Sequence, residues 1–214
     1  DYRLLTVLSR FRIGLGFGEK TVAQVCGEAG VDADAFILIC NMYSYAGYVP
    51  TGDALKAADP MAVVEYLHTS HSFYMEDGFR ALEQLMDRLV EPCPPGQKKI
   101  ILDFFNGYRH EVKNHFRYEE TVFFPYVKSV ALGNVSGDYS ASKFEENHGN
   151  IEEKLSDLKN IVMKYLPSSC DRGLAADVLY ALFSLSEDLQ KHTNIENYVL
   201  VPIVNRLESH KKEE

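Results

Sequence analysis

One motif occurs twice in this chain, and its repetition is the feature that most constrains the fold. Residues 115–127 read HFRYEETVFFPYV, and residues 192–204 read HTNIENYVLVPIV. The two stretches carry His, Glu, Val, Pro and Val at the same offsets. A chain that repeats a pattern in this way is expected to fold into two related halves.

The repeat continues upstream of both motifs. A single histidine precedes each one by 44 residues, His71 before His115 and His148 before His192. After each single histidine the halves still agree, and the matched pairs are Glu76 with Glu153, Met86 with Met163, and Leu89 with Leu166. This agreement predicts two helical hairpins packed about a pseudo-two-fold axis.

Four long segments have the apolar periodicity of helices, and Pro- and Gly-containing turns separate them. They cover residues 60–91, 97–132, 140–166 and 173–210. Within the first segment, Leu82, Leu85, Met86 and Leu89 form a stripe along one face. Long helices with short connections predict an all-α fold, an up-down-up-down four-helix bundle.

A smaller helical unit precedes the bundle. We predict a small helical domain over residues 1–52, a linker over 53–59 and the bundle over 60–210. The stretch 21–31 is expected to be a helix ended by glycine, and Asp59-Pro60 is typical of a helix start, with Asp as the cap and Pro as the first helical residue.

Composition excludes several classes of protein. The 214 residues are 46% hydrophobic and carry a formal net charge of −9, so a general affinity for nucleic acid or anionic membrane is not expected. Residues 1–50 hold four basic and five acidic side chains, which argues against DNA as a partner. No apolar run is long enough to span a bilayer, so we expect a soluble, cytoplasmic protein without a membrane partner. Its four cysteines form no C-x-x-C pair and are expected to be reduced thiols.

The motif carries the side chains of a metal site. Residues four apart lie on one helix face, so His115 and Glu119 share a side, as do His192 and Glu196. Together with His71 and His148 from the other helices, they would bring four imidazoles and two carboxylates into the core. Nitrogen and oxygen ligands without thiolate suit iron or manganese, and the set is large enough for two metal ions.

Two alternatives stay open at this point. Each histidine taken alone could be a core residue hydrogen-bonded to a neighbour, although that reading does not explain six matched residues. His68, one turn before His71, could take its place as the ligand of the first helix. The equal 44-residue spacings favour His71.

The residues of both motifs resemble those of the hemerythrin-type (HHE) domain, whose motif is His-x-x-x-Glu followed by an apolar residue and proline. The resemblance covers about residues 60–208 and is nearest to the di-iron proteins of iron-sulfur cluster repair (the RIC, ScdA or YtfE type), because oxygen-carrying hemerythrins use a fifth histidine. It implies two iron ions with oxo and carboxylate bridges, and manganese remains an alternative. The implied metal ligands are His71, His115, Glu119, His148, His192 and Glu196.

The N-terminal stretch 8–26 is similar to the short ScdA-N domain that precedes the bundle in those repair proteins. One departure stands out. Where that family carries adjacent cysteines, this chain has Gly14-Leu-Gly-Phe-Gly18 without a thiol. A redox or metal-transfer step that uses the cysteine pair therefore lacks its thiols at this position.

The resemblance implies a function. The expected protein binds or reduces NO or O₂, or donates iron to an iron-sulfur client protein, under nitrosative or oxidative stress; whether it turns over as an enzyme stays open. The alternative is an O₂ or NO carrier or sensor that signals through its N-terminal domain to a partner. A third interpretation is a structural bundle with zinc or no metal. The sequence leaves monomer and homodimer open.

Overall fold

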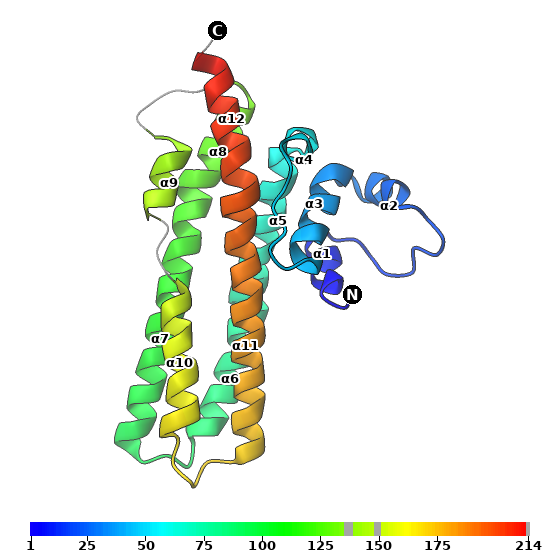
Figure 1. The fold of residues 1–214 in the computed structure, drawn as a ribbon. Helices are drawn as coiled ribbons and strands as arrows, with labels where there is room; N and C mark the ends of the chain where they lie inside the picture. Colours follow the sequence, from blue (N-terminus) through cyan, green and yellow to red (C-terminus); the bar gives the residue numbers. More distant parts are fainter. Residues whose placement is uncertain (135–138, 148–150, 213–214) are drawn as a thin grey trace. The chain divides into compact units, whose positions relative to one another are not determined.

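The computed structural model describes residues 1–134, 139–147 and 151–212 of the chain. Over these ranges every regular element is a helix, so the predicted all-α helical fold is confirmed (Figure 1). The predicted segments 60–91, 97–132 and 173–210 are largely helical, and the predicted segment 140–166 holds two described helices, Ala141–Asn147 and Ile151–Tyr165. The predicted ligand His148 lies outside the described residues.

Among the described residues, three short π-helical segments, labelled η, follow α-helices directly. In chain order the elements are α1 Leu4–Arg10, α2 Val22–Ala29, α3 Ala33–Ser44, α4 Gly52–Ala57, α5 Pro60–Ser72, η1 Phe73–Gly78, α6 Phe79–Val90, α7 Pro95–Tyr118, η2 Glu119–Phe123, α8 Phe124–Ala131, α9 Ala141–Asn147, α10 Ile151–Tyr165, α11 Arg172–Ile195, η3 Glu196–Leu200 and α12 Val201–Lys212.

The chain divides into two compact units, and each is described by itself. The first unit comprises Asp1–Ser70, Glu119–Asn147 and Lys191–Glu214, and the second comprises His71–Tyr118 and His148–Gln190. The predicted division at residues 52 and 60 stays a prediction. The segment predicted as a linker contains a short helix, α4.

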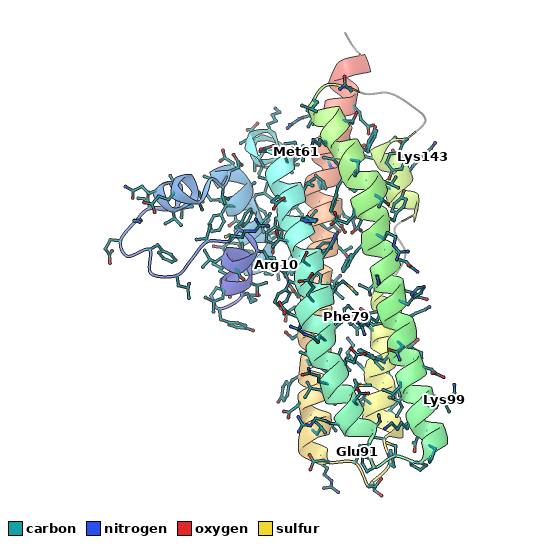
Figure 2. All side chains as sticks on the ribbon, turned by 180° about the vertical axis from the view of Figure 1, so that it is seen from behind. Arg10, Met61, Phe79, Glu91, Lys99 and Lys143 are labelled. Carbon is teal, nitrogen blue, oxygen red and sulfur yellow. The ribbon has the colours of Figure 1, made fainter. Side chains whose placement is uncertain are left out.

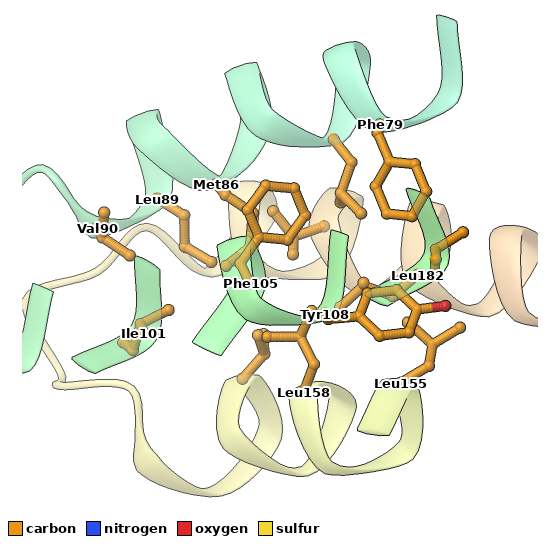
Figure 3. Packing of buried hydrophobic residues seen from close by; sticks show 14 of the residues in the cluster. Phe79, Met86, Leu89, Val90, Ile101, Phe105, Tyr108, Leu155, Leu158 and Leu182 are labelled. Atoms are coloured by element: carbon orange, nitrogen blue, oxygen red, sulfur yellow. The ribbon is translucent and has the colours of Figure 1, made fainter. Parts of the chain in front are cut away.

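The second unit is a four-helix arrangement around an apolar core. In Figure 1, successive helices α6, α7, α10 and α11 run in opposite directions. Figure 3 shows side chains of all four meeting in the middle. The labelled ones, at most 2% exposed, are Phe79, Met86, Leu89, Val90, Ile101, Phe105, Tyr108, Leu155, Leu158 and Leu182. Burial of such side chains, each contributing about 1.5–3 kcal/mol relative to exposure, is the main stabilisation of this unit.

In the first unit, a buried carboxylate connects three helices. Glu208 in α12 is 7% exposed, and its Oε1 accepts hydrogen bonds from the Tyr126 hydroxyl at 2.7 Å and the Ala141 backbone N–H at 3.0 Å. Tyr126 belongs to α8, and Ala141 is the first residue of α9. One glutamate therefore fixes α8 and the start of α9 against α12.

Two helix ends of the same unit, the end of α2 and the start of α5, lie where the sequence predicts them. Thr21 caps α2 through a capping box with Gln24, and Gly30 ends the helix with a φ of 67°, in the left-handed region that favours glycine. The Asp59 carboxylate accepts from the Met61 backbone N–H at 2.9 Å at the start of α5. The predicted cap of the first bundle helix is therefore confirmed.

A buried arginine joins this N-terminal region to α5. Arg10, labelled in Figure 2, is 3% exposed, and its Nη1 donates to the Tyr43 hydroxyl at 2.8 Å and the Tyr66 hydroxyl at 3.5 Å. Phe11 packs on the Tyr66 ring with the ring centres 4.9 Å apart. Helices α1, α3 and α5 thus share one buried polar contact.

Candidate metal centre

Three residues of the repeated motif are buried together in the first unit. Glu119 begins η2, His192 lies near the end of α11, and Glu196 begins η3. The two glutamates are 0% exposed and His192 is 1% exposed. Glutamate is almost never fully buried unless it is paired or coordinates a metal, so two of them here point to a specific role.

The side chains face one another through their ligand atoms. His192 Nε2 lies 3.2 Å from Glu196 Oε1 and 3.9 Å from Glu119 Oε2. The first contact is the i,i+4 pair that the motif predicts on one helix face. The second comes from a segment more than seventy positions earlier in the chain, so one imidazole nitrogen faces two carboxylates.

These three side chains of the first unit could together hold a metal ion. Glu119, His192 and Glu196 offer ligand atoms that all lie within 4.8 Å of one another. The predicted ligand His71 belongs to the second unit. His71 itself is 5% exposed, and its ring stacks on Phe116 with the ring centres 4.1 Å apart. That stacking fixes the orientation of the imidazole.

The remaining predicted ligands are His115 and His148. His115 is half-buried at the end of α7; its Nε2 is buried and its ring lies 5.8 Å from the ring of Phe116. His148 lies outside the described residues. Their part in a metal site stays a prediction.

His68 and His71 differ in their burial and in their contacts. The His68 side chain is 50% exposed, and its Nδ1 lies 2.9 Å from both carboxylate oxygens of Glu120. His68 is thus engaged with the glutamate next to Glu119 in sequence, whereas His71 is buried. Burial therefore favours His71 as the ligand.

At each of these two glutamates the chain changes from an α-helix to a π-helix. α7 and α11 both span 24 residues, and a five-residue π-helix follows each of them, beginning at Glu119 and at Glu196. The third described π-helix, η1, begins two residues after His71. Such segments are rare in proteins and frequently mark functional sites.

The prolines of the motif explain two of the π-helices. Pro125 and Pro202 are the second residues of α8 and α12, directly after η2 and η3. Proline has no backbone N–H, and its ring clashes with the carbonyl four residues before it, so a regular α-helix cannot continue through this point. A wider π turn accommodates the proline without ending the helix. These turns were not predicted from the sequence, although the two prolines are the signal for them.

The donor set fits a bound cation. Two carboxylates within 4.8 Å of each other, both removed from water, repel when both are ionised. A cation held between them offsets this repulsion and uses the imidazole as a further ligand. The set contains nitrogen and oxygen without sulfur, which suits iron or manganese better than a structural zinc site.

An aromatic stack lies at the end of η2 in the first unit. Phe123, the last residue of η2, is 0% exposed and stacks on Phe144 of α9 with ring centres 3.7 Å apart. Leu200, which ends η3, is also 0% exposed. Both π-helical segments therefore end on a fully buried apolar side chain.

Comparison with known families gives one match. The chain matches the family described as "Hemerythrin HHE cation binding domain" over residues 62–204, about two thirds of its length. A search of curated proteins and a search of solved structures found no match. Within the part of the chain that the structure describes, no helix is long and apolar enough to cross a membrane.

Proposed function

Because the chain belongs to the hemerythrin HHE cation-binding family, we propose that it is a non-haem di-iron protein of the iron-sulfur cluster repair type. It would bind or reduce NO or O₂, or donate iron to an iron-sulfur client protein, under nitrosative or oxidative stress. The observation that carries the proposal is the buried cluster of Glu119, His192 and Glu196.

In this proposal six residues hold the two iron ions, and they are His71, His115, Glu119, His148, His192 and Glu196. Bound iron supplies open coordination positions for a small diatomic ligand and a reversible change of oxidation state. The chain itself fixes the ligands. Glu119 and Glu196 provide the negative charge that balances the metal, and the His192 Nε2 nitrogen is already directed at both carboxylates.

Metal content of matched variants tests the ligand assignment. The wild-type protein, expressed with iron and purified, should contain about two iron atoms per chain by elemental analysis. Glu119→Gln and His192→Ala should each remove most of this iron. Glu120→Gln and His68→Ala are the matched controls, because this exposed pair lies beside the cluster in sequence and should leave the iron content unchanged.

The same experiment separates iron from the alternatives. Purified protein that takes up zinc or manganese and rejects ferrous iron on reconstitution would contradict the proposal. So would a Glu119→Gln variant with full iron content. An absorption spectrum that bleaches with dithionite and changes with NO under anaerobic conditions would support the binding of a diatomic ligand.

Iron donation has its own measurement. The iron-loaded protein would be mixed with an iron-sulfur protein whose cluster has been damaged by NO, and recovery of the cluster absorbance would be followed. Recovery that depends on Glu119 and His192 supports repair. Gas binding without recovery would assign carriage or sensing in its place.

A sensor function is the second candidate, and one contact favours it. Lys191, the neighbour of His192 in α11, donates from Nζ to the backbone carbonyl of Met42 in α3 at 3.0 Å. A movement of His192 on ligand binding would therefore also move Lys191 and disturb its hydrogen bond to α3. We infer that this contact would carry a signal to a partner protein.

Lys191→Met tests the sensor candidate. The variant should keep its iron and its NO-dependent spectrum, because Lys191 is not a proposed ligand. Hydrogen exchange of the α3 amides should respond to NO in the wild type and lose this response in the variant. An α3 that exchanges at the same rate with and without NO in the wild-type protein would rule the signal out.

A further inference from the structure

Two cysteines that the metal centre does not use lie in contact in the second unit. Cys93 Sγ is 3.3 Å from Cys170 Sγ, although 77 positions separate them in the chain. Cys93 lies in the connection between α6 and α7, and Cys170 lies in the connection between α10 and α11. Both are free thiols with 8% of their surface exposed.

A groove reaches one of the two thiols. It measures about 400 Å³ and is lined by Cys170 together with Val162, Leu166, Pro167 and Arg172. Its walls are mostly apolar, and Arg172 supplies a positive charge next to the cysteine. A small molecule with a carboxylate could approach Cys170 from this side.

We propose that Cys93 and Cys170 form a reversible intramolecular disulfide, by exchange with a low-molecular-weight disulfide that carries carboxylates and enters this groove. The two sulfur atoms are already in contact, so the bond requires only a small local movement. The proposal does not depend on the bound metal or on the proposed function.

The exchange takes place in two steps. The Cys170 thiolate attacks one sulfur of the small disulfide, a mixed disulfide forms, and the departing thiolate takes a proton from water. Cys93, as thiolate, then attacks Cys170 Sγ and expels the second small thiol, which takes up the proton that Cys93 has lost. The two protein thiols are oxidised by two electrons, and the small disulfide is reduced to two thiols.

The environment assigns a different role to each cysteine. Burial, together with the hydrogen bond to Cys170, raises the pKa of the Cys93 thiol to about 11. Cys93 therefore has little thiolate near neutral pH and does not line the groove. Cys170 lines the groove and meets the incoming disulfide, and Cys93 resolves the mixed disulfide.

The cross-link would be visible directly in the wild-type chain. The metal-loaded, reduced protein would be incubated without oxygen in glutathione disulfide, alkylated, digested and analysed by mass spectrometry. The peptides of Cys93 and Cys170 should be joined and should separate on reduction. Cys40→Ala, which removes a half-buried cysteine of the first unit, is the matched control and should leave the cross-link unchanged.

Single variants test the order of the two steps. Cys93→Ser should accumulate glutathione on Cys170, because the resolving thiol is missing. Cys170→Ser should leave Cys93 largely free of glutathione. Arg172→Ala should slow oxidation by glutathione disulfide several-fold and leave oxidation by the uncharged hydroxyethyl disulfide unchanged.

Two results would overturn the inference. One is a wild-type protein in which both cysteines are still fully alkylated after the incubation, while the free thiol of an added unfolded peptide has been oxidised. The other is a disulfide that joins Cys93 or Cys170 to a different cysteine. Equal glutathione attachment to Cys93 and Cys170 in the two single variants would overturn the assigned roles.

Discussion

Glu119 and Glu196 each open a π-helical turn, at equivalent positions of the two copies of the motif. Pro125 and Pro202 follow at the same distance in each copy. The repeat in the sequence is therefore also a repeat in backbone geometry. Four predictions extend from this finding and from the packing around it.

Replacing a motif proline should weaken metal binding without removing a ligand. In Pro125→Ala and Pro202→Ala the backbone N–H is restored, so the π turn can revert to a regular α-helix and rotate the glutamate side chain. We expect metal affinity to fall by about 10–100-fold, as for other residues that orient ligands. Competition with a chelator of known affinity measures this.

Pro60→Ala is the matched control for the two proline variants. Pro60 is the first residue of α5, where no backbone N–H is required. Its replacement should leave metal affinity unchanged. Metal affinity equal to wild type in Pro125→Ala would show that the π turn does not position Glu119.

Glu119→Gln should have opposite effects on stability with and without metal. Without metal, the change removes the repulsion between two buried carboxylates, and the free energy of unfolding should rise. With iron, the same change removes a proposed ligand and should lower the free energy of unfolding. Urea unfolding of chelator-treated and iron-loaded protein measures both signs; a variant less stable than wild type in both states would contradict the metal assignment.

Ionisation of Tyr126 should lower the free energy of unfolding at alkaline pH. Burial and the hydrogen bond to Glu208 raise the pKa of Tyr126 above its usual value near 10. The folded state therefore holds the neutral phenol, and this contribution is complete below pH about 10 and lost as pH rises through the higher folded pKa. In Tyr126→Phe the free energy of unfolding should decline less steeply above pH about 10.

The same variant should also be less stable at neutral pH. Loss of a hydrogen bond to a charged group costs about 1.5–3 kcal/mol. Tyr139→Phe is the comparison variant, because the Tyr139 ring packs against the Tyr126 ring with the ring centres 4.9 Å apart and the substitution keeps that aromatic ring. An alkaline decline equal to that of wild type in Tyr126→Phe would show that Tyr126 is not the group responsible.

Replacing Arg10 should lower the free energy of unfolding far more than replacing its neighbour Arg12. Arg10→Ala removes a buried guanidinium that donates to Tyr43 and Tyr66, and should lower the free energy of unfolding by about 2–4 kcal/mol. Arg12→Ala removes an exposed ion pair with Glu65, which should cost less than about 1 kcal/mol. Thermal and urea unfolding compare the two, and similar losses would contradict the role given to Arg10.

Local signals made much of the fold predictable from sequence. Apolar periodicity indicated the long helices, glycine indicated the end of α2, and Asp59 indicated the start of α5. Each of these features depends on residues within a few positions of one another. The interaction that determines the structure is therefore visible in a short window of sequence.

Features that depend on contacts between distant segments were harder to predict from the sequence. His68 and His71 lie one turn apart on α5, and only the packing of other segments leaves one exposed and the other buried. The approach of Glu119 to His192 likewise joins separate helices. The contact between Cys93 and Cys170 could have been suspected only by aligning the two halves, because neither cysteine lies in a recognisable motif.

The cysteine contact has a consequence for how the two halves can change. Cys93 and Cys170 are separated by 77 positions, the same interval that separates Glu119 from Glu196, so they are equivalent residues of the repeat. If two identical copies of one hairpin paired, this residue would contact the same residue of the other copy. A single substitution would then change both partners of the contact. In the joined chain each side is encoded separately, so one thiol can be lost or tuned while its counterpart is kept.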